Sequence, residues 1–336
     1  MKLGQYVARK TVWYLVALVA AVSLNFLLPR LVPGNPVDVI VSNLARGGAV
    51  NGEQQKQIYE GFVQQFGLNA PLWQQFLTYL GKVFTGDLGT SFASYPTSVN
   101  SLLGQALPWS IAVQLPAIVI GWVLGNVVGA VAAFRGGNWD RSVFTSSLFL
   151  SAMPYYCLSI LLLYGLAVVA GIFPVGGAYS LGNSPALSLD FLTDALQYYW
   201  LPFLSLVIVF IGGQAVGMRS MAIYELGGDY VNYGRAMGIG DNRITRYIFR
   251  NAMLPQITGL ALSIGTLVSG ALITELVFNY PGVGTLLFNA ISQNDYPVIQ
   301  AITLIITLAV LAANFLVEIV YGIVDPRIRA AASGEK

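Results

Sequence analysis

Few residues of this chain could do chemistry, and most of them are charged. Three arginines, Arg243, Arg246 and Arg250, fall on one narrow face of a helix, where they can donate charge-assisted hydrogen bonds to carboxylate or carbonyl groups. Two carboxylates, Glu275 and Glu318, stand inside long apolar runs. Such carboxylates either hydrogen-bond between helices or line the path of a solute.

The commonest general base in catalysis, histidine, is missing from the sequence. The 336 residues include no histidine, and the single cysteine, Cys157, cannot form an intramolecular disulfide. Lys82 is the only lysine that follows a glycine, and Val83 stands where a phosphate-binding loop needs Ser or Thr. No Ser-Lys pair or nucleophile elbow is recognisable. We therefore expect no catalytic residue, cofactor or metal on this chain.

The composition is that of a membrane protein. Hydrophobic residues make up 56% of the chain and charged residues 10%, against about 25% charged in soluble domains. A helix needs about 20 apolar residues to cross a bilayer. Six runs reach roughly this length: 11–30, 108–134, 142–170, 200–217, 255–279 and 298–323. The sequence predicts an all-α integral membrane protein with six transmembrane helices, surrounded by lipid and not by nucleic acid.

The first run could be a cleavable signal, because Lys2, Arg9 and Lys10 precede it and Val19-Ala20-Ala21 forms a weak cleavage site. The apolar run continues to Leu28, beyond the usual core of a signal peptide. We interpret it as a permanent anchor.

The distribution of lysine and arginine predicts the orientation. Thirteen of the seventeen fall on the side of the termini and of the segment 218–254, and the other four are Arg30, Arg46, Lys56 and Lys82. The positive-inside rule therefore places both termini and 218–254 in the cytoplasm.

These spans divide the chain into an N-terminal segment with the first helix (1–30), a long external segment (31–107), a core membrane domain (108–323) and a cytoplasmic tail (324–336). In the external segment, "LWQQFLTYLGKVF" from residue 72 predicts an amphipathic helix, which the glycines of "GDLGTS" end. A second outer loop is expected at about 171–199, and "NYPGVG" at 279–284 predicts a turn.

Polar residues inside the spans are expected mainly to connect helices. Glu275 falls near the outer end of its span, and either a hydrogen bond between helices or the translocation path would explain it. Asp295, which precedes Pro297, is predicted to be the N-cap of the last span. Packing roles are expected for Asn25, Gln114, Asn126, Gln214 and Asn314.

The cytoplasmic segment 218–254 predicts two helices joined by Gly238 to Gly240. Asp241 or Asn242 is expected to cap the second helix, which is short because Pro255 should open the next span. Ile244, Ile248 and Ala252 share a face apart from the arginines. The arginines either fix the topology and reach lipid phosphates, or they form a docking surface for a cytoplasmic partner.

This segment resembles the cytoplasmic "EAA" loop of importer permeases of the ATP-binding cassette (ABC) class, with Gly234-Arg235-Ala236-Met237-Gly238 and Leu254-Pro255 as its elements. Further segments resemble the dipeptide/oligopeptide permeases, in the first of their two paired membrane subunits: "VPGNP" (32–36), "GDLGTS" (86–91), "TELVFNYPGVG" (274–284), "NDYPVIQ" (294–300) and "DPRIR" (325–329). The chain departs from this pattern at Asn35, usually Asp, and at Met237, where Lys is common.

The resemblance implies a type I ABC importer fold, in the bacterial or archaeal cell membrane. Its partners would be a homologous second permease, two cytoplasmic ATPases that bind ATP and Mg²⁺, and an external solute-binding protein. The loop helix would insert into a groove on the ATPase. The residues carried over to this contact are Gly234, Arg235, Ala236, Gly238, Asn242, Arg243, Arg246, Tyr247, Arg250 and Leu254.

Two questions stay open at the level of sequence. The resemblance implies peptides as cargo, with oligosaccharides or nickel chelates as alternatives. An ion-coupled carrier that acts alone is a different class of function, and it would use Glu275.

Overall fold

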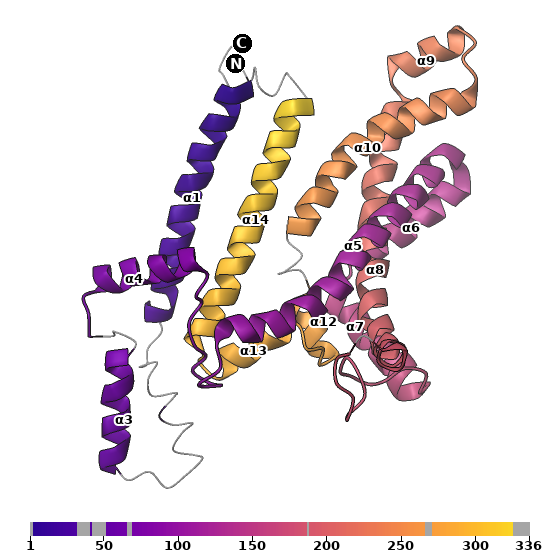
Figure 1. Cartoon of the computed structure of the whole chain (residues 1–336). Helices are drawn as coiled ribbons and strands as arrows, with labels where there is room; N and C mark the ends of the chain where they lie inside the picture. Colours follow the sequence, from indigo (N-terminus) through magenta and orange to yellow (C-terminus); the bar gives the residue numbers. More distant parts are fainter. Residues whose placement is uncertain are drawn as a thin grey trace. The chain divides into compact units, whose positions relative to one another are not determined.

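The computed structural model describes residues 3–31, 41, 52–65, 69–186, 188–265 and 271–324 (Figure 1). In these ranges the regular structure is helical, apart from an isolated bridge between Thr90 and Ser98. The chain divides into two compact units. The first contains residues 1–108 and 282–336, and the second contains residues 109–281.

The first unit is built on two long antiparallel helices, α1 (Leu3–Leu31) and α14 (Tyr296–Val324). Near the start of α1, Lys10 Nζ lies 2.7 Å from Glu318 Oε2 near the end of α14. Near the other end of the pair, Asn25 Nδ2 donates to the carbonyl of Gln300 at 2.8 Å, and Thr303 Oγ1 donates to Asn25 Oδ1 at 2.6 Å. The predicted packing role of Asn25 is confirmed.

Three shorter helices complete this unit: α3 (Gly52–Gln65), α4 (Leu72–Thr85) and α13 (Val283–Ser292). The helix α4 confirms the predicted amphipathic helix, since the rings of Phe76 and Tyr79 contact Phe26 of α1. Gly86 ends α4 with a φ of 74°. The sequence did not predict α13, which follows the expected turn at 279–284.

The second unit contains most of α5 (Val99–Arg135), then α6 (Gly137–Ala152), α7 (Tyr155–Leu162) and a π-helical turn (Leu163–Val169). It continues with α8 (Leu189–Leu226), α9 (Asp229–Ala236), α10 (Asp241–Gly265) and α12 (Leu272–Val277).

Small residues allow α5 and α8 to approach closely. A Cβ on Gly129 would lie 2.3 Å from the carbonyl oxygen of Ala215, and one on Gly125 would lie 2.8 Å from that of Ile211. A helix contact built on glycines maximises van der Waals packing, which is a main source of helix association in lipid.

Length and composition single out four of the described helices as able to cross a membrane, or five if a bent pair counts as one span. The four are Gly4–Leu27, Val99–Arg135, Leu189–Leu226 and Tyr296–Ile319. They overlap four of the six predicted runs. The helix α8 begins at residue 189 because Ser188 Oγ accepts from Phe191 N at 3.2 Å, so the expected outer loop at 171–199 is shorter than predicted.

The predicted span 142–170 is not one straight helix. The helix α6 meets the segment Tyr155–Val169, which contains α7 and the π-helical turn, at an angle of 96°, with the break at Met153-Pro154. Met153 is extended, with a ψ of 124°. The residue before a proline disfavours the helical region, which explains the break.

The predicted fifth span and its cytoplasmic neighbour also differ from the structure. The sequence predicts a short helix that ends before Pro255 and a span that begins there. Instead, α10 runs without interruption from Asp241 through Pro255 to Gly265 (Figure 1). Residues 266–270 lie outside the described residues, as do the "VPGNP" segment, the "DPRIR" segment and the tail from 325 onwards.

Candidate functional site

The helices α9 and α10 form a helical hairpin at the end of α8, which we call the α9–α10 hairpin. Its turn is a Schellman motif, in which Gly238 N donates to Arg235 O and Ile239 N donates to Gly234 O, both at 3.0 Å. Gly238 has a φ of 75°, a left-handed conformation that glycine adopts without steric cost. The predicted glycine turn is therefore present at the predicted place.

One face of the hairpin is buried and apolar. Val231 of α9 packs with Ile244 and Ile248 of α10, and all three side chains are at most 3% exposed. Ala252 continues the buried row into a neighbouring cluster. This row confirms the predicted apolar face and joins the two helices into one body.

The opposite face of α10 is exposed and basic. Arg243, Arg246 and Arg250 are exposed, and Tyr247 among them is 46% exposed. The structure thus separates the arginines from the apolar row as the sequence predicted.

The remaining predicted residues occupy different surroundings. Gly234 is buried under Ile239, whereas Ala236 and Asn242 are exposed and Leu254 is 53% exposed. Arg235 Nε lies 3.9 Å from Asp241 Oδ1, a solvent-exposed pair of little energetic weight.

The expected N-cap of α10 is displaced by one residue. Helix α10 begins at Asp241, and the carbonyl of Gly240 accepts from Arg243 N at 2.9 Å. Asp241 and Asn242 therefore stand inside the first turn. There the carboxylate of Asp241 is still favoured by the helix dipole.

A carboxylate that we did not predict connects the hairpin to α8. Glu225 Oε2 accepts from Tyr230 Oη of α9 at 2.6 Å and from Asn251 Nδ2 of α10 at 3.3 Å. Partial burial, and then the hydrogen bond to Glu225, raise the pKa of Tyr230 above its ordinary value. The phenol is therefore protonated at neutral pH, and one carboxylate links three helices.

A second unpredicted link joins α6 and α8. Arg219 donates to Asp140 through Nε and Nη2, each at 2.6 Å, and its guanidinium carbon lies 4.2 Å from the centre of the Phe144 ring. Two parallel hydrogen bonds fix the angle of the guanidinium plane. The sequence carried no signal for this pair, because its members are 79 residues apart.

Glu275 lies away from the hairpin, in α12. It is 3% exposed, and one carboxylate oxygen accepts from Gln114 Nε2 of α5 at 3.0 Å. Gln114 is 4% exposed, so this hydrogen bond between helices is buried. The contact matches one of the two roles considered for Glu275.

Asp295 precedes α14 as expected, but its side chain does something other than cap that helix. The carboxylate is 2% exposed and accepts from the Ser91 hydroxyl, from Phe92 N at 3.0 Å and from Ala93 N at 3.2 Å. Asp295 stands at the predicted N-cap position, where its carbonyl accepts from Ile299 N at 3.0 Å, but its side chain accepts from another segment of the chain. Asp295 thus connects the "GDLGTS" segment to the "NDYPVIQ" segment.

In the described ranges, no three His, Cys, Asp or Glu side chains gather as a metal site would require. The hairpin offers basic and aromatic groups on a preformed surface.

Comparison with known proteins identifies the family. Residues 125–330 match the family described as "Binding-protein-dependent transport system inner membrane component". The chain is 32% identical to the di/tripeptide transport system permease protein DppB of Pseudomonas aeruginosa, over 96% of this chain and 98% of that protein.

Two further relatives agree with this match. The oligopeptide transport system permease protein AppB of Bacillus subtilis is 30% identical over 97% of this chain and 99% of its own length. The dipeptide transport system permease protein DppB of Escherichia coli K12 is 30% identical over 97% of this chain and 98% of its own length. The chain therefore belongs to the family of binding-protein-dependent transport system inner membrane components, and it is similar to peptide permeases along nearly its whole length.

Proposed function

We propose that this chain is one of two paired permease subunits of an ATP-driven importer and forms half of the path for peptides. The family match and the names of the full-length relatives support this role. An external solute-binding protein would deliver the cargo, and two cytoplasmic ATPases would bind ATP and Mg²⁺. The cell membrane of a bacterium or archaeon is the proposed location.

The α9–α10 hairpin is the proposed contact with the ATPases. The observation that supports this most strongly is the separation of its faces: Ile244 and Ile248 are buried, while Arg243, Arg246 and Arg250 are exposed. Exposed arginines can donate charge-assisted hydrogen bonds to an acidic or carbonyl-lined groove.

The continuity of α10 suggests how motion would pass through the hairpin. The arginines and residues 255–265 belong to one helix, so a displacement of the arginine face would move this whole helix. Glu225 would carry the same motion to the end of α8. Domain closure displaces rigid elements of this kind as single units.

Six spans with both termini in the cytoplasm remain our proposal for the topology. The antiparallel pair of α1 and α14 supports an even number of crossings, because Lys10 and Glu318 bring the start of one helix to the end of the other. The charge distribution supports the cytoplasmic side for these ends.

Peptides are the proposed cargo because the relatives' names point to peptides. The same architecture importing oligosaccharides or nickel chelates is the alternative. A carrier driven by an ion gradient is a further alternative, in which Glu275 would have to exchange ions in place of its bond to Gln114.

The test is to purify the tagged chain gently from its native cell, identify the copurifying proteins by mass spectrometry and measure ATP hydrolysis with and without peptide. We expect a second permease, ATPases and hydrolysis that rises when the binding protein and a peptide are added. A chain that purifies alone and takes up solute only under an ion gradient would overturn the proposal.

A further inference from the structure

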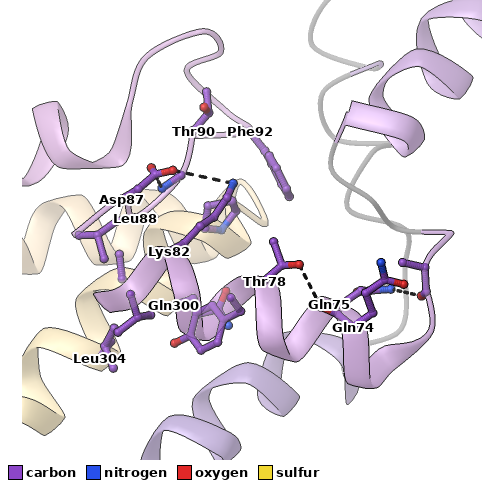
Figure 2. Close-up of a pocket in the computed structure, with 16 residues that line it drawn as sticks. Gln74, Gln75, Thr78, Lys82, Asp87, Leu88, Thr90, Phe92, Gln300 and Leu304 are labelled. Atoms are coloured by element: carbon purple, nitrogen blue, oxygen red, sulfur yellow. Dashed lines mark hydrogen bonds and ion pairs between the residues drawn. The ribbon is translucent and has the colours of Figure 1, made fainter. Parts of the chain in front are cut away.

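A cavity of about 420 Å³ lies within the first unit, outside the α9–α10 hairpin (Figure 2). It is lined by α4, by the loop that follows α4 and by the first turns of α14. Cavities of about 300–1,000 Å³ are typical of small-molecule sites in proteins. The volume therefore suits a short peptide.

One face of α4 lines the cavity with polar side chains. Gln74, Thr78 and Lys82 are spaced four residues apart, so they form a row along the helix, as Figure 2 shows. The neighbouring face carries Phe76, which contacts Phe26 of α1. The polar row therefore faces the cavity while the apolar face attaches the helix to α1.

Two opposite charges stand at this cavity. Lys82 Nζ lies 3.9 Å from Asp87 Oδ2, and the side chains are 52% and 55% exposed (Figure 2). An exposed pair at this distance stabilises the fold little. Both groups can therefore exchange this loose contact for a ligand of complementary charge.

The two charges differ in mobility. Asp87 Oδ1 accepts from Gly89 N at 2.9 Å, and Asp295 fixes the same loop further on through Phe92 N. Lys82 has a four-carbon stem and only a loose contact with Asp87, so its ammonium group can move several ångströms. A fixed carboxylate and a mobile ammonium group can adapt to ligands of slightly different length.

The rest of the cavity wall combines an amide with apolar groups. Gln300 of α14 reaches the cavity while its Nε2 donates to Asn25 O of α1 at 3.1 Å, which orients the side chain. Ala301, Leu304 and Leu88 supply apolar surface. A fixed amide suits a peptide backbone, and the apolar surface suits small side chains.

We propose that this cavity binds a short zwitterionic peptide, whose ammonium group contacts Asp87 and whose carboxylate contacts Lys82. The inference rests on the proposed function for its cargo class, and it adds a peptide site on the permease chain itself. A neutral oligosaccharide would gain little from two opposite charges. A dipeptide spans roughly 7 Å when extended, which the mobile Lys82 can accommodate.

The test uses the full chain in lipid nanodiscs and dialanine as the probe, with binding measured by NMR titration. N-acetyl-dialanine lacks the ammonium group and dialanine amide lacks the carboxylate. We expect each blocked derivative to bind the wild type about tenfold more weakly than dialanine, because each loses one charge-assisted contact.

The variants match each charge to one end of the peptide. Lys82→Gln should weaken the binding of dialanine about tenfold and leave the binding of dialanine amide unchanged. Asp87→Asn should weaken the binding of dialanine about tenfold and leave the binding of N-acetyl-dialanine unchanged. Asn keeps the acceptor for Gly89 N, so the loop is preserved. Lys56→Gln, an exposed lysine of α3, is the control and should bind all three probes like the wild type.

Three results would each overturn the inference. They are equal binding of the three probes to the wild type, no binding of dialanine, and variants that bind all probes like the wild type. Copurification of the ATPases is measured on the same preparations. If the ATPases copurify and the expected differences in binding among probes and variants are absent, the peptide site alone is wrong. If these differences are present and no ATPase copurifies, the site stands and the importer proposal fails.

Discussion

The carboxylate of Asp295 accepts a hydrogen bond from the Ser91 hydroxyl, 204 residues earlier in the chain. Backbone amides of Phe92 and Ala93 donate to the same carboxylate. The contact connects the loop after α4 to the first turn of α14. Both segments line the cavity proposed for a peptide, so this carboxylate positions one wall of it against another.

Asp295→Ala should loosen this loop, because two amides and a hydroxyl lose a charged acceptor that is 2% exposed. Each hydrogen bond to a charged group contributes about 1.5–3 kcal/mol. We expect faster limited proteolysis between residues 86 and 98 and a lower unfolding temperature in detergent. Ser91→Ala removes one donor to this carboxylate and the acceptor for Ser94 N, and leaves both amide bonds to Asp295, so it should have a smaller effect. Equal effects would contradict the account.

Gly238→Ala should weaken the α9–α10 hairpin by about 1 kcal/mol, because a residue with a Cβ avoids the left-handed conformation. Gly227→Ala is the matched control, since Gly227 has a φ of −81° and a Cβ there would lie 3.6 Å from the carbonyl oxygen of Tyr224 in ordinary contact. The measurement is ATPase recovery on copurification together with peptide-stimulated ATP hydrolysis. Loss of ATPase recovery in the Gly227 variant with none in the Gly238 variant would contradict the role of the turn.

Glu225→Leu should loosen the contact of the hairpin with the end of α8, because Tyr230 and Asn251 lose a shared acceptor. Hydrogen exchange of the α9 amides should accelerate, by an amount that corresponds to about 1 kcal/mol. Glu225→Gln keeps an acceptor and should lie between the wild type and the leucine variant. Unchanged exchange in the leucine variant would show that this carboxylate does not fix the hairpin.

Asp140→Asn should destabilise the contact of α6 with α8, because Arg219 loses its bidentate partner. We expect a loss of about 1–3 kcal/mol in the free energy of unfolding. The exchanged pair Asp140→Arg with Arg219→Asp should recover part of it. The losses in unfolding free energy of Asp140→Arg and of Arg219→Asp are measured separately and added. A double variant that loses as much as this sum would argue against the ion pair.

The sequence predicted those features that depend on local pattern. The faces of α10 follow from helical periodicity, so the burial of Ile244 and Ile248 opposite the arginines was predictable. The ends of α4 and α9 at Gly86 and Gly238 follow from the conformational freedom of glycine.

The two prolines show where local pattern was insufficient. Pro154 breaks the chain between α6 and α7, whereas Pro255 stands inside α10. Proline removes one backbone donor in both places. In α10, however, the turns that precede Pro255 are packed through the buried row from Ile244 to Ala252, which keeps the helix continuous. Sequence alone could not distinguish them, because the difference lies in tertiary packing.

Contacts between distant residues were also beyond prediction. Asp295 was expected to cap its own helix, and Glu225 and the pair of Asp140 with Arg219 were not expected at all. Each of these carboxylates accepts hydrogen bonds from partners that only the folded chain brings together. Residue type predicts that these side chains accept hydrogen bonds, but it does not predict their partners.

The most direct test of the central claim is crosslinking from the arginine face. In a Cys157→Ser background, Arg246→Cys carries a short heterobifunctional crosslinker, and Phe149→Cys, a 66% exposed position of α6, is the control. We predict an adduct with the ATPase from position 246, which changes in yield when ATP is added, and none from position 149. An assembled complex that gives no ATPase adduct from position 246 would contradict the account.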